Sequence, residues 1–270
     1  MAECGATRAD LKRRRSEVRG PPRRIRPSAD RKSAAKAQKP VVLVIDVGGS
    51  KIKLRKSDSP HTLKFESGPK MTPGEMVVQT MLLTAKWEYD VVSIGFAGPV
   101  VHGKPASDPD NLGPGWTEFD FRKAFRKPVK LINDAAMQAL GCYTGGRMLF
   151  LGLGTGLGST LILDEVVVPL ELGQLRYSKD ETLEDVLGKD SLKEIGRKKW
   201  EAAVHAAVDN LHKAFVADYT VLGGGNAKKL EKLPKGTRRG SNRYAFRRGV
   251  RLWQKAPITA EVREHTLVIA

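Results

Sequence analysis

The feature that most constrains the fold of this chain is an apolar hairpin pattern that occurs twice. In residues 148–163, MLFLGLGTGLGSTLIL, two apolar runs flank a turn rich in glycine and threonine. Residues 40–54, PVVLVIDVGGSKIKL, have the same layout about a hundred residues earlier. Apolar runs of this length joined by a glycine turn predict β-hairpins. Two such hairpins in one chain indicate an internal repeat.

The glycine turns lack the spacing of the common nucleotide-binding motifs. Three residues after Gly156 comes Ser159, which excludes a G-x-G-x-x-G fingerprint there, and the segment has no lysine for a Walker A loop. Glycine lets backbone N–H groups approach a ligand closely, so an exposed turn of this kind suits phosphate oxygens, although ordinary hairpin turns are common. The first turn also carries Asp46 at the end of its strand. This acid favours the interpretation that the two glycine turns are the two halves of one phosphate-binding clamp.

The positive charge of the chain is concentrated in two segments. The 270 residues carry a net charge of +17, and residues 1–40 contribute 13 basic and 4 acidic side chains with little apolar content. Such a composition predicts a disordered basic tail over residues 1–39. Residues 226–255 hold 11 basic side chains and one acid. This second segment suits a polyanionic ligand or is an ordinary basic surface.

Cysteine content and hydropathy limit the class of protein. Cys4 and Cys142 are the only cysteines, so a disulfide framework is excluded and a reducing cytoplasm is the expected location. No apolar run approaches the roughly 18 to 20 residues of a membrane span, so no membrane partner is expected. The length allows one or two domains.

Strands and helices alternate after Pro40. Short apolar strands are predicted at Val91–Phe96, Val129–Ile132 and Tyr219–Leu222, and a helix follows Asn133 and Asp134. A capping box at Ser191–Glu194 predicts one amphipathic helix that continues to Phe215. This order indicates a mixed α/β sheet with helical layers, in which ligands bind beyond the carboxyl ends of the strands.

Asp134 is the candidate catalytic residue. It follows a predicted strand and begins a predicted helix, where Asn and Asp are also preferred as plain helix caps. A carboxylate at this place can instead accept the proton of a substrate hydroxyl during phosphoryl transfer.

The motifs, taken in chain order, resemble the ROK sugar kinases of the actin-like and hexokinase-like ATPases. They are DVGGSKIK (46–53), GFAGPV (95–100), NLGPGW (111–116), NDAAMQALG (133–141), LGLGTGLGS (151–159), ELGQ (171–174) and LGGGNAKKL (222–230). The resemblance implies a two-lobed, duplicated ribonuclease H-like α/β fold. We expect an N-terminal lobe at residues 40–133 and a C-terminal lobe at residues 134–270.

The resemblance also implies roles for individual residues. The phosphate-binding set is Asp46, Gly48, Gly49, Ser50, Lys51, Gly154, Thr155 and Gly156, with Asp46 near a hydrated Mg²⁺. The sugar-binding set is Asn111, Asn133, Asp134 and Glu171, with Asp134 as the base. The loop beside the nucleotide base is Gly223, Gly224 and Gly225. The expected reaction transfers a phosphoryl group from ATP or polyphosphate to a hexose hydroxyl, with glucose or an amino sugar as acceptor.

Two departures from the family pattern keep alternatives open. The family motif E-x-G-H ends here in Gln174, and the chain lacks the Cys-rich zinc motif, so no zinc is expected. The zinc-free branch resembles polyphosphate or ATP glucokinases. A ROK-type sugar-responsive transcription regulator and a non-catalytic sugar-binding relic are the rivals. Nucleic acid is not an expected partner except through the basic tail, and a homodimer is compatible with the sequence.

Overall fold

The structure is a computed structural model that describes residues 39–240, 249–253 and 267–268. The predicted tail, residues 1–39, lies outside the described residues except for Lys39. In the part of the chain that is described, no helix has the length and apolar character that a membrane crossing requires.

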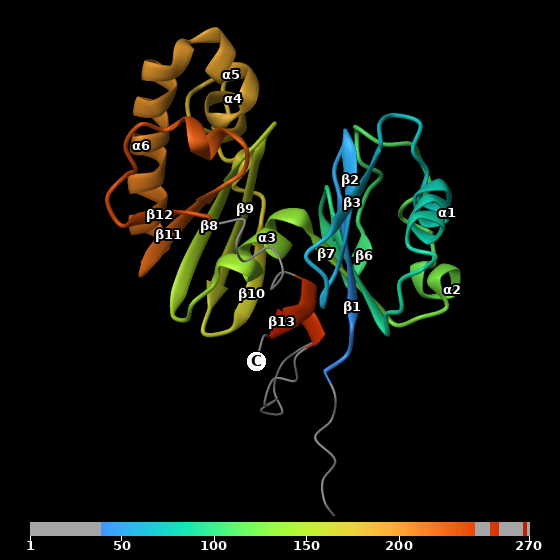
Figure 1. Cartoon of the computed structure of the whole chain (residues 1–270). Coiled ribbons are helices and arrows are strands. Elements are labelled where there is room, and N and C mark those ends of the chain that lie inside the picture. The colour runs from blue at the N-terminus through green and yellow to red at the C-terminus, as the bar shows by residue number, and fades with distance from the viewer. Residues whose placement is uncertain (1–38, 241–248, 254–266, 269–270) are drawn as a thin grey trace, which may run out of the picture. The chain divides into compact units, whose positions relative to one another are not determined.

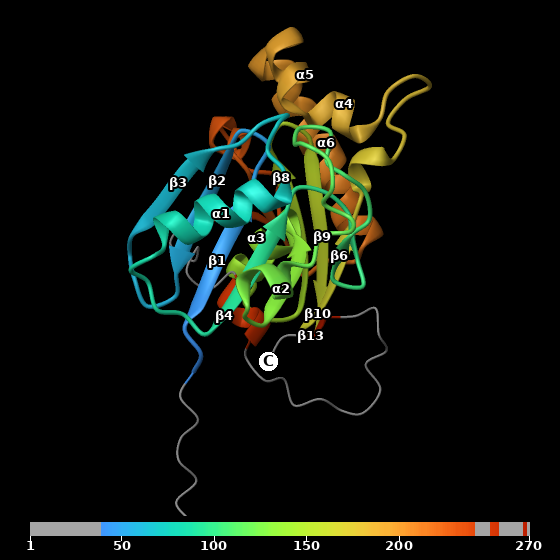
Figure 2. The same ribbon diagram turned by 90° about the vertical axis from the view of Figure 1, so that its right-hand side faces the viewer.

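The first sheet has five strands in the order β3-β2-β1-β4-β7 (Figure 1). Strands β1 (Val42–Val47), β2 (Lys51–Lys56) and β3 (Thr62–Glu66) form an antiparallel meander, and β4 (Val91–Phe96) and β7 (Val129–Asn133) run parallel to β1. Helices α1 (Pro73–Leu83) and α2 (Phe121–Phe125) pack on one face, and Figure 2 shows α1 in front of β1 and β2. A small hairpin of β5 (Val100–Val101) and β6 (Lys104–Pro105) follows β4.

The second sheet has the order β12-β11-β8-β9-β10-β13. Strands β8 (Arg147–Leu153), β9 (Leu157–Leu163) and β10 (Val166–Leu170) are antiparallel, and β11 (Tyr219–Gly223) and β12 (Thr237–Arg239) run parallel to β8. The short β13 (Leu267–Val268) pairs with β10. Helices α4 (Leu183–Leu187), α5 (Lys189–Glu194) and α6 (Gly196–Ala214) cover one face, and the 3-10 turns are η1 (Leu172–Gln174) and η2 (Asn226–Lys229).

The two sheets repeat one topology. The series β3-β2-β1-β4-β7 in the first sheet matches the series β10-β9-β8-β11-β12 in the second, strand for strand and direction for direction. The two glycine turns join the equivalent pairs β1–β2 and β8–β9. The predicted hairpins, the internal repeat and the duplicated α/β fold class are therefore confirmed.

Helix α3 (Asp134–Cys142) lies at the centre of a core to which both sheets contribute. Its buried alanines and Met137 share this core with side chains from β1, β8 and β9. A 3-10 turn near the C-terminus, η4 (Gly249–Trp253), packs against β1, β4 and α3, and Trp253 Nε1 donates to Ser93 Oγ at 2.9 Å. The boundary predicted at residues 133 and 134 falls where β7 passes into α3; the domain limits themselves stay a prediction.

The predicted single helix from Ser191 to Phe215 is wrong. Ser191 lies inside α5, and the chain breaks before α6, where Gly196 has a φ of 78°. The capping box forms instead at Thr182, whose extended backbone lets its side chain accept from the Asp185 N–H while the Asp185 carboxylate accepts from Thr182. A residue that is already helical cannot take the extended conformation of a cap, so the spacing at Ser191 was coincidental.

Candidate active site

The first glycine turn follows the carboxyl end of β1. The Gly48 N–H donates to the Lys51 carbonyl at 3.2 Å, and Ser67 Oγ donates to the Gly48 carbonyl at 2.6 Å, so the turn is fixed from two sides. A Cβ on Gly49 would lie 2.8 Å from Cβ of Asn111. The residue at position 49 must therefore be small, and Asn111 lies directly against this turn.

Asn111 belongs to a loop that is anchored by its own side chains. The Asp108 carboxylate accepts from the Gly115 N–H at 2.9 Å and the Trp116 N–H at 2.7 Å. These hydrogen bonds hold the pKa of Asp108 below its usual value. Trp116 is fully buried against Phe96. A loop held in this way keeps Asn111 at the first glycine turn.

The second glycine turn follows β8 and is braced by the chain around it. The Gly154 N–H donates to the Gly156 carbonyl at 3.1 Å, and Asn226 Nδ2 donates to the Gly154 carbonyl at 2.8 Å. The Lys189 N–H donates to the carbonyl of Thr155 at 3.0 Å, and Thr155 is exposed. The turn is thus rigid, with the Thr155 side chain directed to solvent.

The third glycine run, at the end of β11, has three different environments. A Cβ on Gly223 would lie 2.4 Å from the Phe150 ring. Gly224 has a φ of 78°, and its Cβ would lie 2.3 Å from the Leu153 carbonyl oxygen. Gly225 has no atom within 4 Å of a Cβ position. Gly223 and Gly224 are therefore needed for packing, whereas Gly225 has open space beside it.

A cavity of about 650 Å³ joins residues of both sheets. Asp46 and Lys53 of the first sheet line it together with Gly154 of the second turn, Gly223–Gly225, and the basic side chains Lys228 and Arg239. Among its described lining residues, glycine backbone and three cations outnumber the one carboxylate, Asp46, and such a lining suits a polyanion.

Asn133 and Asp134 lie where β7 passes into α3. Asn133 is the helix cap: its Oδ1 accepts from the Ala136 N–H at 3.1 Å, and its Nδ2 donates to the Gly98 carbonyl at 3.1 Å. Its buried amide therefore also holds the glycine loop that follows β4. Asp134 is the first residue of the helix and is not its cap.

The environment of Asp134 raises the pKa of its carboxyl to about 6. Burial is the largest cause, followed by the negative charge of Asp46, with a smaller contribution from Glu171; backbone N–H groups of residues 134 and 135 act in the opposite direction. Asp134 therefore lies within electrostatic range of two other carboxylates, Asp46 and Glu171. A carboxyl with a pKa close to neutrality is suited to proton transfer.

Close packing brings the start of α3 to β9. A Cβ on Gly158 would lie 2.9 Å from the Cβ of Ala135, so only glycine lets the helix lie at this depth. Because Ala135 directly follows Asp134, Gly158 fixes how near the Asp134 carboxyl comes to the second sheet.

Glu171 and Glu184 form a second acidic group. Burial and the negative charge of Glu184 raise the pKa of Glu171. Glu184 Oε2 accepts from the Leu157 N–H at 3.3 Å, and the carboxylate would lie 2.6 Å from a Cβ on Gly156. Gln174, which stands where the family motif has histidine, is exposed on η1.

The two lysines of the first motif lie in different surroundings, and the phosphate-binding role of Lys51 stays a prediction. Lys51 Nζ lies 3.1 Å from the Glu66 carboxylate on an exposed surface and does not line the cavity. Lys53 Nζ lines it and donates to Asp46 Oδ2 at 3.1 Å. Alternation along β2 puts both lysines on one face, so the sequence could not distinguish them.

Sequence reasoning also missed Glu184 and Asn226. Glu184 is in a helix that was not predicted, and Asn226 directly follows the third glycine run. The motif containing Asn226 was recognised, but nothing in it indicated the hydrogen bond to Gly154. A capping-box search at Thr182–Asp185 would have found the helix that carries Glu184.

Among the described residues that line the cavity, Asp46 is the one carboxylate that can share a metal ion with phosphates. In the described ranges, no group of three or more His, Cys, Asp or Glu side chains could hold a metal ion. Mg²⁺ is usually held by one or two carboxylates together with water and substrate phosphates. The residues fit that mode of binding, with the Lys53 ammonium as a competing partner of Asp46.

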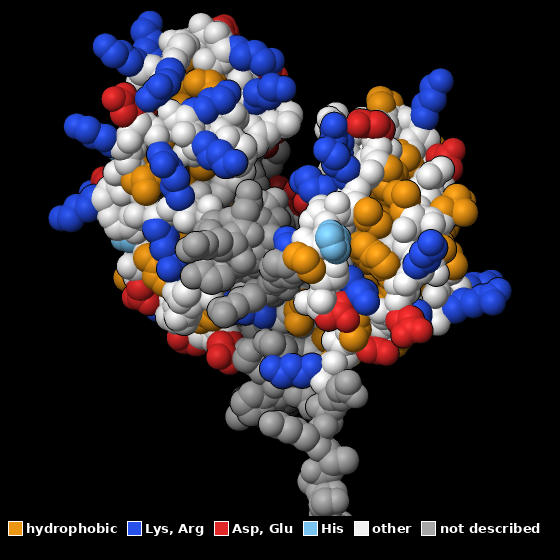
Figure 3. Space-filling model, viewed as in Figure 1, with side chains coloured by type: hydrophobic (Ala, Val, Ile, Leu, Met, Phe, Trp, Pro, Cys, Tyr) orange, Lys and Arg blue, Asp and Glu red, His pale blue; other side chains and the backbone are white. Residues whose placement is uncertain are grey.

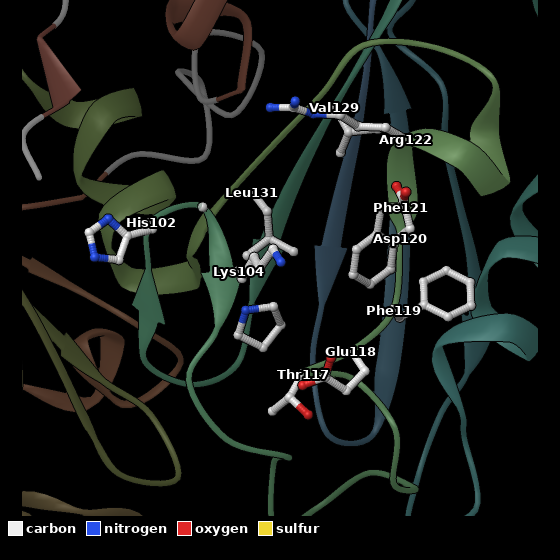
Figure 4. A pocket seen from close by; sticks show the side chains of 12 residues that line it. His102, Lys104, Thr117, Glu118, Phe119, Asp120, Phe121, Arg122, Val129 and Leu131 are labelled. Carbon is white, nitrogen blue, oxygen red and sulfur yellow. The ribbon is translucent and has the colours of Figure 1, made fainter. Parts of the chain in front are cut away.

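A second cavity of about 460 Å³ lies in the first lobe (Figure 4). Phe121, Val129 and Leu131 form its apolar floor, and Lys104 and Glu118 belong to a rim of mixed charge. It contains none of the predicted site residues.

Comparison with known proteins supports the fold. Neither the protein-family models nor the curated proteins include a match to this chain. Among solved structures, the inorganic polyphosphate/ATP-glucomannokinase from Arthrobacter sp. strain KM is 22% identical, with a TM-score of 0.65 and coverage of 78% of this chain and 96% of that one. A ROK family glucokinase from Streptomyces griseus, in complex with glucose and AMPPNP, is 18% identical, with a TM-score of 0.58 and coverage of 70% and 84%.

A ROK family transcriptional regulator, a homologue of the E. coli MLC protein, has the same fold. It is 13% identical, with a TM-score of 0.62 and coverage of 78% of this chain and 76% of that one. The chain therefore has the fold of the ROK sugar kinases, which a ROK regulator shares.

Proposed function

We propose that the protein is a sugar kinase in which Asp134 is the general base. The observation that carries this proposal is the burial of the Asp134 carboxyl near the charges of Asp46 and Glu171, which raises its pKa to about 6, while Asn133 caps the helix. A carboxylate that is not needed as a cap, and that is costly to ionise, is typical of a functional site.

In the proposed reaction, the Asp134 carboxylate accepts the proton of a sugar hydroxyl. The hydroxyl oxygen forms a bond to the terminal phosphorus of the donor, and the bond from that phosphorus to the bridging oxygen breaks. ADP or a polyphosphate shorter by one unit leaves with the electron pair. Because the transition state spreads charge over phosphoryl oxygens, positioning and fixed N–H dipoles supply most of the catalysis.

The donor would bind in the 650 Å³ cavity. Backbone N–H groups of the two glycine turns other than those of Gly48 and Gly154, which bond within the turns, would hold the phosphates. Lys53 would take the place of the predicted Lys51, and Gly225 would leave room for the rest of the donor. When bound at Asp46, Mg²⁺ would neutralise part of the charge of the donor phosphates.

The acceptor would bind on the other side of Asp134. Asn111, Glu171 and Glu184 supply an amide and carboxylates that suit sugar hydroxyls, and Asn133 would act chiefly by holding the helix and the loop at Gly98. The likeness to a glucomannokinase and a glucokinase favours glucose or a related hexose as acceptor.

The described basic residues of segment 226–255 lie in different surroundings, so we do not propose one uniform track for polyphosphate along them. Arg238 is held by the Cys142 carbonyl at 2.7 Å and Thr144 Oγ1 at 3.0 Å, and it stacks over the Tyr219 ring. Lys228 and Arg239 line the cavity, where the Arg239 guanidinium also donates to the Leu230 carbonyl. If polyphosphate is the donor, its chain would therefore run along Lys53, Lys228 and Arg239.

A coupled assay with a panel of hexoses and amino sugars, each with ATP and with long-chain polyphosphate, tests the proposal. We expect turnover of at least one sugar with one donor. Lys228→Ala with Arg239→Ala should then raise the KM for polyphosphate, steeply with salt, much more than the KM for ATP, and Arg238→Ala is the matched control. Sugar binding without turnover under every donor would refute the kinase and favour the sugar-responsive regulator.

A further inference from the structure

The cavity of about 460 Å³ in the first lobe is a second possible binding site, which the proposed reaction does not use. Its apolar lining includes Phe121, Val129 and Leu131, which are each 6% exposed or less. Val129 and Leu131 belong to the core under α1 and α2, whereas Ile132 beside them belongs to the core around α3. The cavity therefore lies on the face of the first sheet opposite α3, and its volume is typical of small-molecule sites.

The rim of this cavity carries charges of both signs. Lys104 of β6, Glu118 and Arg122 of α2 line it. Among the described residues, none forms an ion pair or a side-chain hydrogen bond with these three side chains. Asp120 lines the cavity as well, but its Oδ1 caps α2 by accepting from the Lys123 N–H at 3.0 Å. Two cations and one carboxylate of the rim are thus available to a ligand.

These surroundings select one class of ligand. In Figure 4, Phe121 and Leu131 lie between Arg122 at one end of the view and Glu118 at the other. A sugar would leave hydroxyl groups without partners against the apolar side chains. A simple anion would lie near the Glu118 carboxylate, and a simple cation would lie near the Lys104 ammonium. A zwitterion with an apolar body satisfies both charges and the apolar lining.

The wider charge distribution of this lobe is nearly balanced. Residues 41–133 contain 13 basic and 10 acidic side chains. Figure 3 shows both kinds interspersed over the lobe that carries α1 and β3. Such a surface does not create the one-sided field that attracts polyanions, so recognition depends on the individual groups at the cavity.

Packed aromatic rings connect the cavity to the candidate active site. The ring centroids of Phe121 and the fully buried Trp116 are 6.2 Å apart. Trp116 Nε1 donates to the Gly113 carbonyl at 2.7 Å, within the loop that carries Asn111. Asn111 in turn lies against Gly49 of the first glycine turn. A ligand that fixes Phe121 therefore also restrains this loop.

Strand β7 provides a second connection. It supplies Val129 and Leu131 to the cavity and ends at Asn133, which caps α3 next to Asp134. Two walls of the cavity thus continue into the elements that hold candidate sugar-binding residues.

We propose that this cavity binds an α-amino acid with a large apolar side chain, and that its occupation strengthens sugar binding. The ligand carboxylate pairs with the Lys104 ammonium, its ammonium group pairs with Glu118, and its side chain packs on Phe121 and Leu131. A ligand that has already ordered the loop of Asn111 reduces the ordering cost of sugar binding, which is positive coupling. The coupling rests on the proposed sugar site, whereas binding of the amino acid does not.

Calorimetric titration of the full chain with L-phenylalanine and with L-leucine tests the site. We expect saturable binding of at least one of them with a Kd of about 1 mM or lower. Its N-acetyl derivative lacks the ammonium group and its methyl ester lacks the carboxylate, so each should bind about tenfold more weakly or worse. Lys104→Ala and Glu118→Ala should each weaken binding to a similar extent. Lys123→Ala, on an exposed position of α2 outside the cavity, is the matched control and should leave the Kd unchanged.

The coupling is tested by measuring the Kd of the sugar with and without the amino acid at saturation. We expect the amino acid to lower the sugar Kd by about fivefold or more, and the sugar to lower the amino-acid Kd by the same factor. Asp108→Ala releases the loop by removing the acceptor of the Gly115 and Trp116 N–H groups. It should reduce the coupling and leave the amino-acid Kd without sugar unchanged.

These titrations need no phosphoryl transfer, so their failure is distinct from failure of the proposed kinase reaction. Four results would overturn the inference: no saturable binding of either amino acid, equally tight binding of a derivative that lacks one charge, binding that survives both Lys104→Ala and Glu118→Ala, or a sugar Kd that the amino acid does not lower.

Discussion

Asn133 caps helix α3 and so removes the need for the adjacent Asp134 to do so. The Asn133 Oδ1 accepts from the Ala136 N–H at 3.1 Å, and Asp134 stands in the first helical position with a pKa raised to about 6. The two residues are both good caps by type. Their division of roles is the basis for most of the predictions below.

Replacement of Asp134 should stabilise the protein near neutral pH. A carboxyl whose pKa is higher in the folded state than in the unfolded state binds its proton more tightly when folded, so the fold loses stability as the pH rises from about 4 to about 6. Asp134→Asn removes this cost and should gain on the order of 1 to 3 kcal/mol at pH 7.5. Denaturant unfolding should show the gain at pH 7.5 and much less at pH 4; a loss at pH 7.5 would indicate a purely structural role.

The rate should depend on the ionisation of the same carboxyl. If Asp134 must be ionised to accept a proton, kcat/KM should fall tenfold per unit of pH below about 6. Glu171→Gln removes one of the charges that raise this pKa, so the acidic limb should move to lower pH. Glu194→Gln, on the exposed part of α5, is the control and should leave the profile in place. An acidic limb that does not move with Glu171→Gln would contradict the electrostatic account.

Lys53 and Lys51 should differ in their effect on the donor. Lys53→Met removes a cation from the cavity wall and should raise the KM for the donor by about tenfold or more, whereas Lys51→Met removes an exposed ion pair worth little. Steady-state kinetics with a fixed, saturating sugar would measure both. An effect of Lys51→Met as large as that of Lys53→Met would favour the assignment of Lys51 to the phosphates that the sequence motif gives.

Gly224 and Gly225 provide a matched pair at the third glycine run. Gly224→Ala forces a Cβ to within 2.3 Å of the Leu153 carbonyl oxygen at a φ of 78°, so it should cost well over about 1 kcal/mol of stability. A Cβ at position 225 meets no atom within 4 Å, so Gly225→Ala should have the unfolding temperature of the unsubstituted protein. Any effect of this substitution should be limited to donor affinity. Thermal unfolding of the two variants checks the pair, and equal losses would contradict the close packing at Gly224.

The fold was predictable because its signal is local and repeated. The apolar runs on either side of Asp46–Ser50 and Gly154–Gly156 predicted the two hairpins, and the topology of both sheets follows from that repeat. The break between α5 and α6 was not predicted, because Trp200, Val204 and Val208 keep helical spacing after Gly196 and hide the interruption.

The candidate site was predictable only where a motif is contiguous. Asp134 directly follows its strand, so its position at the start of a helix could be predicted from the sequence. Its proximity to Asp46 could not, because it depends on how the two sheets pack around α3. Glu184 approaches Gly156 from a helix 28 residues further along the chain, and no local pattern contains that information. The choice between Lys51 and Lys53 likewise depends on Glu66 in the neighbouring strand.

The most direct test of the account is the single-turnover rate of Asp134→Asn with the sugar and donor that the panel assay identifies. Asparagine keeps the size of the side chain and a hydrogen-bonding oxygen but cannot accept the proton of the hydroxyl. We predict a protein that is folded, that binds the sugar within a few-fold of the unsubstituted protein by calorimetry, and that transfers the phosphoryl group about a hundredfold to ten-thousandfold more slowly. A variant that transfers phosphate within a few-fold of the original rate would show that Asp134 is not the base.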